Sequence, residues 1–287
     1  MIGFVSSLQP LGELVLVNAC LAFSQYVVLR AGVFSLATAG FASLGAYGAA
    51  ILAARHGVPM PLALVGAGLI GAVAGLVLSV PLSRLRGVYQ AIATLAFVQI
   101  VLSLALYLEP VTGGAMGMNG LPRLIGGWEL ILVFGVIFYA MLALSRAGIG
   151  STFDAIRQEE TVAVSLGIRV VDYHRLAFAL SGALGGLGGG LMALRNYSLV
   201  PEDFGFPLLI AVLTFVVLGG RVSPVGPVVG AAVLTLLPEI ARPLADYRLL
   251  VNGVLMVLVI IYWPHGIVDT IRLHLRQRRH AVSQAAP

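Results

Sequence analysis

The spacing of its charged residues constrains this chain more than any other feature. Charged side chains make up 10% of the sequence, and nine of the uncharged runs between them are 16 to 28 residues long. As helix, about 20 apolar residues cross the ~30 Å hydrocarbon core of a bilayer and satisfy their own backbone hydrogen bonds there. We therefore predict one all-α domain, residues 1–287, folded as a polytopic transmembrane helical bundle of about eight to ten spans, with nine preferred. The runs are 14–29, 31–54, 56–83, 87–108, 130–145, 176–194, 204–220, 222–238 and 249–268.

The arginines predict the orientation of this bundle, because short cytoplasmic loops carry an excess of basic residues. If the spans alternate and the basic tail 269–287 lies inside, 12 of the 17 arginines collect on the cytoplasmic side. Those are Arg30, Arg84, Arg86, Arg146, Arg157, Arg169, Arg175, Arg221, Arg272, Arg276, Arg278 and Arg279. We expect the N-terminus outside and the C-terminus in the cytoplasm. The formal charge of +5 is attributed to this topology and to contact with anionic lipid, and not to nucleic-acid binding.

Several kinds of chemistry are excluded by residues that the chain lacks. It contains no lysine, so it holds neither a Walker A phosphate loop nor a Schiff base. Its five histidines lack the i, i+4 spacing of a zinc-binding helix, and no cluster of acids suggests a membrane-bound transferase. We expect a protein that is not an enzyme and that binds no metal or cofactor of its own.

Ionisable groups are absent from the interiors of the nine runs, whereas proton-coupled carriers place such groups within the bilayer. A conduit driven from outside the chain fits this pattern, and a self-contained secondary carrier or channel is the alternative. The uncharged polar residues of the runs are expected mainly to form hydrogen bonds between helices. They are Asn18, Gln25, Gln90, Thr94, Gln99, Ser181, Thr214 and Asn252. The candidates for a translocation path are Tyr47, Thr94, Gln99, Gly113, Gly114 and Asn119.

Glycines at helical spacing mark close helix contacts. In GALGGLGGG (182–190), Gly182, Gly186 and Gly190 share one face of a helix, with Gly185 and Gly189 beside it. Small residues four apart let two helix backbones approach each other. The partner of this face is either another helix of the same chain, a second membrane subunit of the same kind or the translocation path.

Two further stretches carry weaker signals. The glycine-rich segment between Pro110 and Pro122 is either a connecting loop or a backbone nest that accepts a carboxylate. The stretch GGRVSPVGPVVGAA (219–232) echoes residues 31–50 in a Gly-x-x-Ser turn followed by a span, which suggests a remnant of internal duplication.

The segment 146–175 is charged in a chain that is otherwise apolar. Residues 154–166 predict one short amphipathic helix, with Ser151 or Thr152 as its N-cap and Gly167 as its stop. A helix that lies on lipid usually has basic residues on its polar face, whereas Glu159 and Glu160 here outnumber Arg157. The segment is therefore expected to contact a protein on the cytoplasmic side.

The stretch FDAIRQEETVAVSLGIRVVDYHRLAFALSGALGGLGGGL resembles the cytoplasmic loop and following span of branched-chain amino-acid ABC-importer permeases of the LivM type. Four further blocks resemble that family in the same order along the chain: LRGVYQAIATLAFVQIV, VTGGAMGMNGLPRL, VVLGGRVSPVGPVVGAAVLTLLPEI and LADYRLLVNGVLMVLVI.

The resemblance implies a permease subunit of the bacterial inner (plasma) membrane that carries branched-chain or related amino acids. Its implied partners are a second permease of the LivH type, two ATPase subunits that bind ATP and magnesium, and an extracytoplasmic solute-binding protein. In that family the loop holding ETVAVSLG (160–167) docks on the ATPase, although Thr161 and Val162 depart from the general pattern Glu-Ala-Ala-x-x-x-Gly. The implied coupling residues are Ile156, Glu159, Glu160, Ala163, Leu166 and Gly167.

Overall fold

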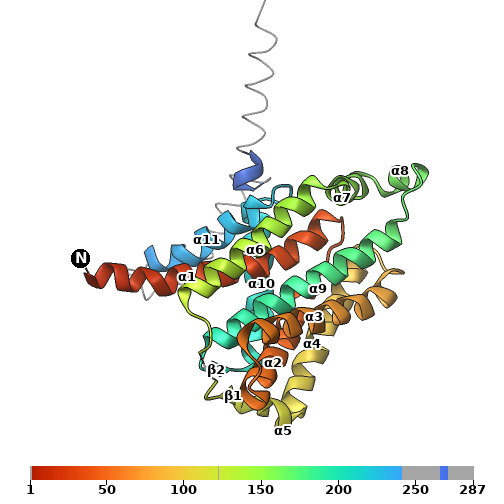
Figure 1. Ribbon diagram of the computed structural model, residues 1–287. Coiled ribbons are helices and arrows are strands. Elements are labelled where there is room, and N and C mark those ends of the chain that lie inside the picture. The colour runs from red at the N-terminus through yellow and green to blue at the C-terminus, as the bar shows by residue number, and fades with distance from the viewer. Residues whose placement is uncertain (1, 122, 241–265, 271–287) are drawn as a thin grey trace, which may run out of the picture.

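The computed structural model describes residues 2–121, 123–240 and 266–270. Within these ranges the chain is mostly helical (Figure 1). The longer helices are α1 (Ile2–Arg30), α2 (Thr38–His56), α3 (Met60–Leu82), α4 (Val88–Tyr107), α6 (Gly127–Arg146), α9 (Val170–Arg195), α10 (Phe206–Gly219) and α11 (Val225–Ile240). The shorter elements are α5 (Glu109–Thr112), α7 (Gly148–Gln158), α8 (Glu160–Ser165), and the 3-10 helices η1 (Gly114–Met116) and η2 (Pro201–Phe204). Strands β1 (Met118–Asn119) and β2 (Ser198–Leu199) pair antiparallel.

The helices agree with the predicted membrane architecture. Six helical stretches of the described residues are long and apolar enough to cross a bilayer: Gln9–Arg30, Met60–Leu82, Val88–Tyr107, Gly127–Arg146, Val170–Arg195 and Pro201–Gly219. The runs 31–54 and 222–238 coincide with α2 and α11, which do not meet that standard, and most of 249–268 lies outside the described residues. The all-α membrane class is confirmed, and the count of nine spans stays a prediction.

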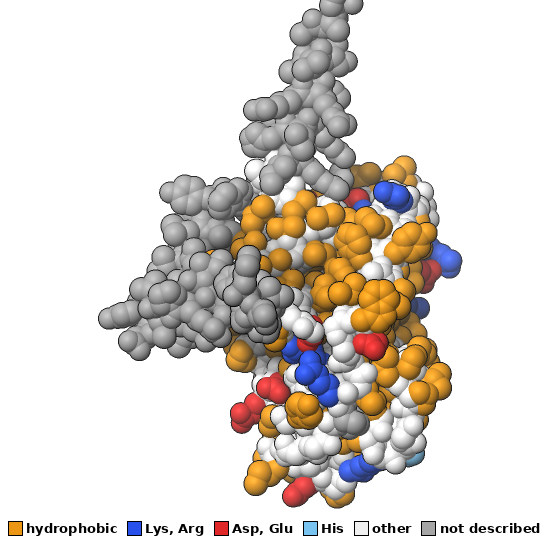
Figure 2. All heavy atoms as spheres, turned by 60° about the vertical axis from the view of Figure 1, so that its left-hand side comes forward, with side chains coloured by type: hydrophobic (Ala, Val, Ile, Leu, Met, Phe, Trp, Pro, Cys, Tyr) orange, Lys and Arg blue, Asp and Glu red, His pale blue; other side chains and the backbone are white. Residues whose placement is uncertain are grey.

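The outer surface of the bundle is apolar, as contact with lipid or with another membrane helix requires. Val77 on α3, Ile100 on α4 and Val136 on α6 are among the large hydrophobic side chains that remain exposed. On the face drawn in Figure 2, hydrophobic side chains cover broad areas and charged side chains form only small groups.

Helix α9 lies at the centre of the bundle and packs against α1, α2 and α3. Its glycines explain the close approach. A Cβ atom on Gly182 would collide with the Gly71 carbonyl of α3, and one on Gly189 would collide with the Ala42 carbonyl of α2. Gly185, Gly186 and Gly190 also face atoms of the same chain, so this glycine face packs inside the subunit.

The ion pairs and loop contacts define two ends of the bundle. At the first, which we call the α7–α8 end, Arg30 closes α1 and pairs with Asp154 in α7. At the second, the β1–β2 end, Arg195 closes α9 and pairs with Glu13 near the start of α1. The elements α5, β1 and β2 lie far from α8 in Figure 1. Helices α1 and α9 therefore run in opposite directions between these two ends.

The proposed sequence echo corresponds to two turns with the same local geometry. Gly32 and Gly220 both have positive φ angles, of 79° and 115°. Three residues later in each turn, a serine hydroxyl accepts a hydrogen bond from the backbone N–H two positions ahead: Ser35 at 3.2 Å and Ser223 at 3.3 Å. The turn after α1 and the turn after α10 thus share a glycine and a serine bond at the same spacing, although the bonded N–H belongs to the N-cap of α2 and to the first residue of α11.

Candidate functional site

The charged segment 146–175 forms two short helices rather than one. Helix α7 ends at Gln158, Glu159 is extended with φ −158° and ψ 106°, and α8 begins at Glu160. The prediction of one helix over 154–166 is wrong at this residue. After the bend, Ala163 packs in a small buried cluster with Ile156 and Val170.

The ends of these helices also differ in part from the prediction. Because α7 begins at Gly148, Ser151 and Thr152 lie inside it, and both hydroxyls donate to the Gly148 carbonyl, at 2.8 and 2.9 Å. They are therefore not N-caps. Gly167 follows α8 with a φ of +82°, so the predicted stop is confirmed.

The apolar side chains of α7 and α8 divide into a buried and an exposed set. Ile156 and Ala163 are buried inside the chain, with Ala163 only 1% exposed, so neither presents a surface to a partner. Val162, Val164 and Leu166 point outward, and Leu166 is 73% exposed. We call Val162, Val164 and Leu166 the α8 apolar patch. Among the predicted coupling residues, Glu159, Leu166 and Gly167 are exposed and Glu160 is partly exposed.

Two ion pairs join this segment to the spans. The Arg30 guanidinium donates from Nε and Nη2 to the two carboxylate oxygens of Asp154, at 3.2 and 2.9 Å. Arg86 Nη2 lies 2.9 Å from Glu160 Oε1, but its side chain is 80% exposed. The Arg30–Asp154 pair was not predicted, because the arginines were used only to predict the topology. The one signal was an arginine placed directly at the end of a span.

The candidate path residues do not gather at one place. Thr94 is buried, accepts a hydrogen bond from the Leu36 N–H at 2.9 Å and so supports the turn before α2. Gln99 is exposed on α4. Tyr47 is buried on α2 with its ring centroid 6.4 Å from that of Phe204, and its hydroxyl has no hydrogen-bond partner. Ser43, one turn earlier on α2, also has a buried hydroxyl without a partner.

The glycine-rich loop is folded at the β1–β2 end. Gly113 and Gly114, the candidates for a backbone nest, have positive φ angles of 79° and 59°. Their N–H groups, however, already donate to the Glu109 carbonyl at 2.9 Å and the Thr112 hydroxyl at 3.2 Å. Asn119 is exposed and donates to the Met116 carbonyl at 3.1 Å. In this conformation those N–H groups serve the loop itself and not a bound carboxylate.

Most of the interior polar residues whose side chains form hydrogen bonds join helices, as expected. Asn18 of α1 donates to Thr235 of α11 at 2.9 Å, and Ser24 of α1 donates to the Ser181 carbonyl of α9 at 2.8 Å. Thr214 instead bonds to a carbonyl of its own helix, and Asn252 lies outside the described residues. These bonds hold the bundle together where lipid offers no hydrophobic drive for helix association.

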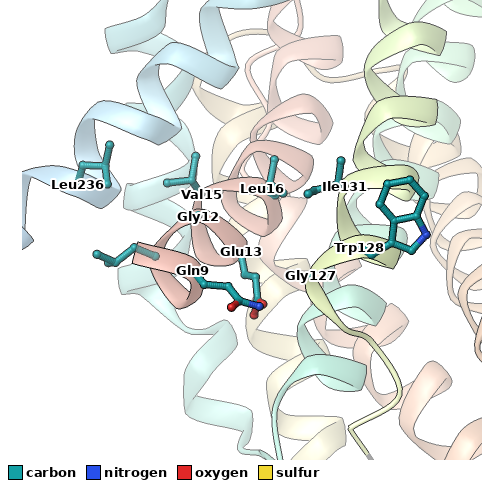
Figure 3. Close-up of a pocket in the computed structure, with 10 residues that line it drawn as sticks. Gln9, Gly12, Glu13, Val15, Leu16, Gly127, Trp128, Ile131 and Leu236 are labelled. Atoms are coloured by element: carbon teal, nitrogen blue, oxygen red, sulfur yellow. The ribbon is translucent and has the colours of Figure 1, made fainter. Parts of the chain in front are cut away.

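A groove of about 860 Å³ opens between α1, α6 and α11 at the β1–β2 end (Figure 3). Its walls are mostly apolar, including Leu16, Ile131 and Leu236. Figure 3 shows Gln9 and Glu13 extending toward the same end of the groove. The Glu13 carboxylate pairs there with Arg195 at 3.1 Å and with Arg123 at 3.3 Å. Across the described residues, no group of three or more His, Cys, Asp or Glu side chains could hold a metal ion.

Comparisons with known proteins give one consistent result. The family described as "Branched-chain amino acid transport system / permease component" matches residues 14–260. The high-affinity branched-chain amino acid transport system permease protein LivM of Salmonella typhimurium is 33% identical over 284 residues, which cover 87% of this chain and 67% of that protein. The LivM protein of Escherichia coli is 33% identical over 289 residues, 89% of this chain and 68% of that protein. A probable branched-chain amino acid transport permease protein LivH of Methanocaldococcus jannaschii is 24% identical over 91% of this chain and 94% of its own length. No solved structure matches the chain significantly.

Proposed function

The chain belongs to the family of permease components of branched-chain amino acid transport systems, and we propose that it imports branched-chain or related amino acids. It is a multi-pass inner-membrane subunit of an ATP-binding-cassette importer, of the LivM type, and is not an enzyme by itself. Similarity to both LivM and LivH places it within a permease pair. In our proposal the pair forms the translocation path, two ATPase subunits bind ATP and magnesium, and an extracytoplasmic binding protein delivers the solute.

The observation that carries this proposal is the α8 apolar patch at the arginine-rich end of the bundle. Among described residues, Arg30, Arg84, Arg86, Arg146, Arg157, Arg169, Arg175 and Arg221 belong to the α7–α8 end by chain order, whereas Arg55, Arg123 and Arg195 belong to the other end. The bias of basic residues supports a cytoplasmic α7–α8 end. We also propose that the basic tail 269–287 is cytoplasmic; its residues 271–287 lie outside the described residues.

The patch suits a protein surface better than lipid. Val162, Val164 and Leu166 are exposed beside Glu159 and Glu160, and acidic side chains are repelled by anionic headgroups. An apolar patch bordered by Glu159 and by the Arg86–Glu160 ion pair fits a complementary cleft in a soluble partner. We assign that partner to the ATPase, so that closure of the ATPases moves α7 and α8 against the spans.

Leu166→Asp tests this assignment. A carboxylate at a buried contact loses its hydration without gaining a partner, which weakens binding. We expect the assembled permease pair to keep its yield while ATPase co-purification and leucine transport in proteoliposomes fall sharply. Ser165→Asp is the matched control, because Ser165 is exposed on α8 but lies outside the patch. Normal ATPase binding and transport in Leu166→Asp would refute the docking role of the patch.

The path itself is proposed to pass α2 at Ser43 and Tyr47. Both carry buried hydroxyls without partners, four residues apart and hence on one face of the helix. Buried hydroxyls are normally hydrogen-bonded, so these two retain the capacity to bond a passing solute or its water. Of the other path candidates, Thr94 is assigned a supporting role, and Gln99, Gly113, Gly114 and Asn119 are kept only as residues near the entrance or the outer surface.

Tyr47→Phe tests the path without changing the size of the side chain. We expect a slower leucine uptake at unchanged assembly and ATPase binding. Tyr107→Phe is the control, because Tyr107 is exposed at the end of α4. Equal uptake in the two variants would remove Tyr47 from the path.

The competing proposal, a self-contained carrier or channel, predicts a different result. Such a protein, purified alone into vesicles, would move solute down an ion or solute gradient. We expect the isolated subunit to be inert, and to turn over no ATP, until the other subunits are added. Gradient-driven leucine flux through the isolated chain would favour the competitor.

A further inference from the structure

Arg30 is a buried cation placed between α1 and α7. It is the last residue of α1 and only 6% exposed, and its guanidinium bonds to both carboxylate oxygens of Asp154. A buried charge is tolerated only when it is paired and hydrogen-bonded, and a bidentate pair also fixes the relative orientation of its partners. Arg157 Nη2 lies 3.7 Å from the same carboxylate. Asp154 therefore ties α7 to the end of the first span.

Tyr26 extends this contact to a second region of the bundle. It lies one turn before Arg30, and its hydroxyl accepts a hydrogen bond from Arg30 Nη1 at 3.0 Å. The same hydroxyl donates to the Val222 carbonyl at 3.2 Å, in the turn between α10 and α11. The guanidinium carbon lies 5.9 Å from the tyrosine ring centroid, within range of a cation–π interaction.

The α10–α11 turn is itself held in a fixed shape. The Val222 N–H donates to Asp269 Oδ2 at 3.0 Å, while its carbonyl accepts from Tyr26. Gly220, with φ +115°, packs against the same carboxylate, and a Cβ at that position would come within 2.7 Å of Asp269 Oδ2. A bond from Tyr26 to Val222 therefore acts on a fixed turn that joins two helices.

The other polar connection between the segment and the spans is weaker. Arg86 and Glu160 form an ion pair whose arginine is largely exposed, and such surface pairs contribute little. Phe153 meets Tyr173 of α9 edge-on at 6.2 Å, an apolar contact that allows more sliding than a bidentate ion pair. Among the described contacts, the series Asp154, Arg30, Tyr26, Val222 is thus the buried, directional one.

We propose that Arg30 and Tyr26 are positioning residues that transmit the movement of α7 to α1 and to the α10–α11 turn. This inference rests on the proposed function, in which the ATPases move α7 and α8. Arg30 holds α1 to Asp154, and the Tyr26 hydroxyl passes the displacement on to the Val222 carbonyl. Breaking the series leaves the ATPase contact in place and disconnects ATP hydrolysis from solute movement.

The test uses Tyr26→Phe and Asp154→Asn in the complete importer, reconstituted with its second permease, ATPases and binding protein. Phenylalanine keeps the ring beside Arg30 and removes the hydroxyl, and with it the bonds to Arg30 Nη1 and to the Val222 carbonyl. We measure leucine transported per ATP hydrolysed. The expected result is near-normal ATP hydrolysis with about a tenfold fall in this ratio, or more, because the variant loses one charge-assisted and one neutral hydrogen bond. Asparagine at 154 should lower the ratio in the same way.

Arg86→Gln is the matched control, because it removes the exposed ion pair to α8 and should leave the ratio unchanged. A wild-type ratio in Tyr26→Phe overturns the inference, whatever the ratio in Asp154→Asn. Failed assembly of Tyr26→Phe also overturns it, because the hydroxyl would then be required for folding and not for transmission. If Leu166→Asp loses the ATPase while Tyr26→Phe transports normally, the proposed function stands and this inference falls. Transport without ATPases would defeat the proposed function itself.

Discussion

Ala163 belongs to the predicted coupling segment, but its own chain covers it and it is not available to a partner. The family resemblance implied that Ala163 is one of the residues that couple the subunit to its ATPase. Its 1% exposure, however, results from contact with Ile156 and Val170 of the same chain. Hydrophobic periodicity indicates that a side chain lies on the apolar face of a helix, but it does not indicate whether its own chain or a partner covers that face.

Ala163→Asp should therefore damage the subunit before it affects a partner. Burying an unpaired carboxylate in this cluster costs several kcal/mol of stability, which is enough to open the α7–α8 segment. We expect a lower melting temperature of the purified subunit in detergent and faster proteolysis between α7 and α9. Val164→Asp is the control, because Val164 is exposed, and it should keep the fold. Equal melting temperatures in the two variants would contradict the burial of Ala163.

The glycines of α9 give a second prediction for single residues. A side chain at Gly186 meets the backbone of Ala67 and Gly71 on α3, so Gly186→Leu forces two helices apart. We expect loss of folded monomer, seen as aggregation during size-exclusion chromatography in detergent. Gly135→Leu is the control, because nothing lies within 4 Å of a Cβ at that position of α6. A folded, stable Gly186→Leu subunit would show that α9 and α3 can separate.

At the scale of elements, the sequence predicted which segments are helical better than it predicted where the helices break. The uncharged runs indicated the long helices, since an apolar stretch in a bilayer has to be helical. The charged segment was correctly expected to be helical and amphipathic, but its break at Glu159 was missed. One extended residue depends on local tertiary contacts, and the helical propensities on either side of it do not encode those contacts. The Arg30–Asp154 pair was missed for a related reason, because 124 residues separate its members.

The stop after α8 is an element-level feature that can be tested. Gly167 holds φ +82°, and a non-glycine residue in the left-handed region costs about 1–2 kcal/mol. Gly167→Ala should loosen the return from α8 to α9, where the Ile168 N–H donates to the Ala163 carbonyl at 3.1 Å. Hydrogen exchange at residues 160–168 should become faster. Gly148→Ala, at the open start of α7, should change exchange little, and equal rates in both variants would contradict the requirement for glycine.

For the whole molecule, the pattern of charges predicted the two ends of the bundle better than it predicted the number of spans. It indicated a two-sided bundle, and the structure places Arg30 and Arg195 at opposite ends, each paired to a different part of the chain. The number of spans could not be fixed, because run length does not separate a marginal span such as α11 from one that crosses the bilayer. The candidate path was the weakest prediction, since a path is defined by side chains from several helices and sequence spacing cannot bring these together.

The orientation of the molecule can be measured with cysteines placed at its two ends. The chain's single cysteine, Cys20, is fully buried, so the background labelling is low. Met116→Cys marks the β1–β2 end, where Met116 is strongly exposed in η1, and Gln158→Cys marks the exposed end of α7. If basic residues face the cytoplasm, a membrane-impermeant maleimide should label position 116 in right-side-out vesicles and position 158 only in inverted ones. Cys20→Ser, otherwise unchanged, gives the blank. The reverse pattern would place α7 and α8 outside the cell, where no ATPase could reach the α8 apolar patch. That result would contradict both the docking role of the patch and the transmission of movement through Arg30 and Tyr26.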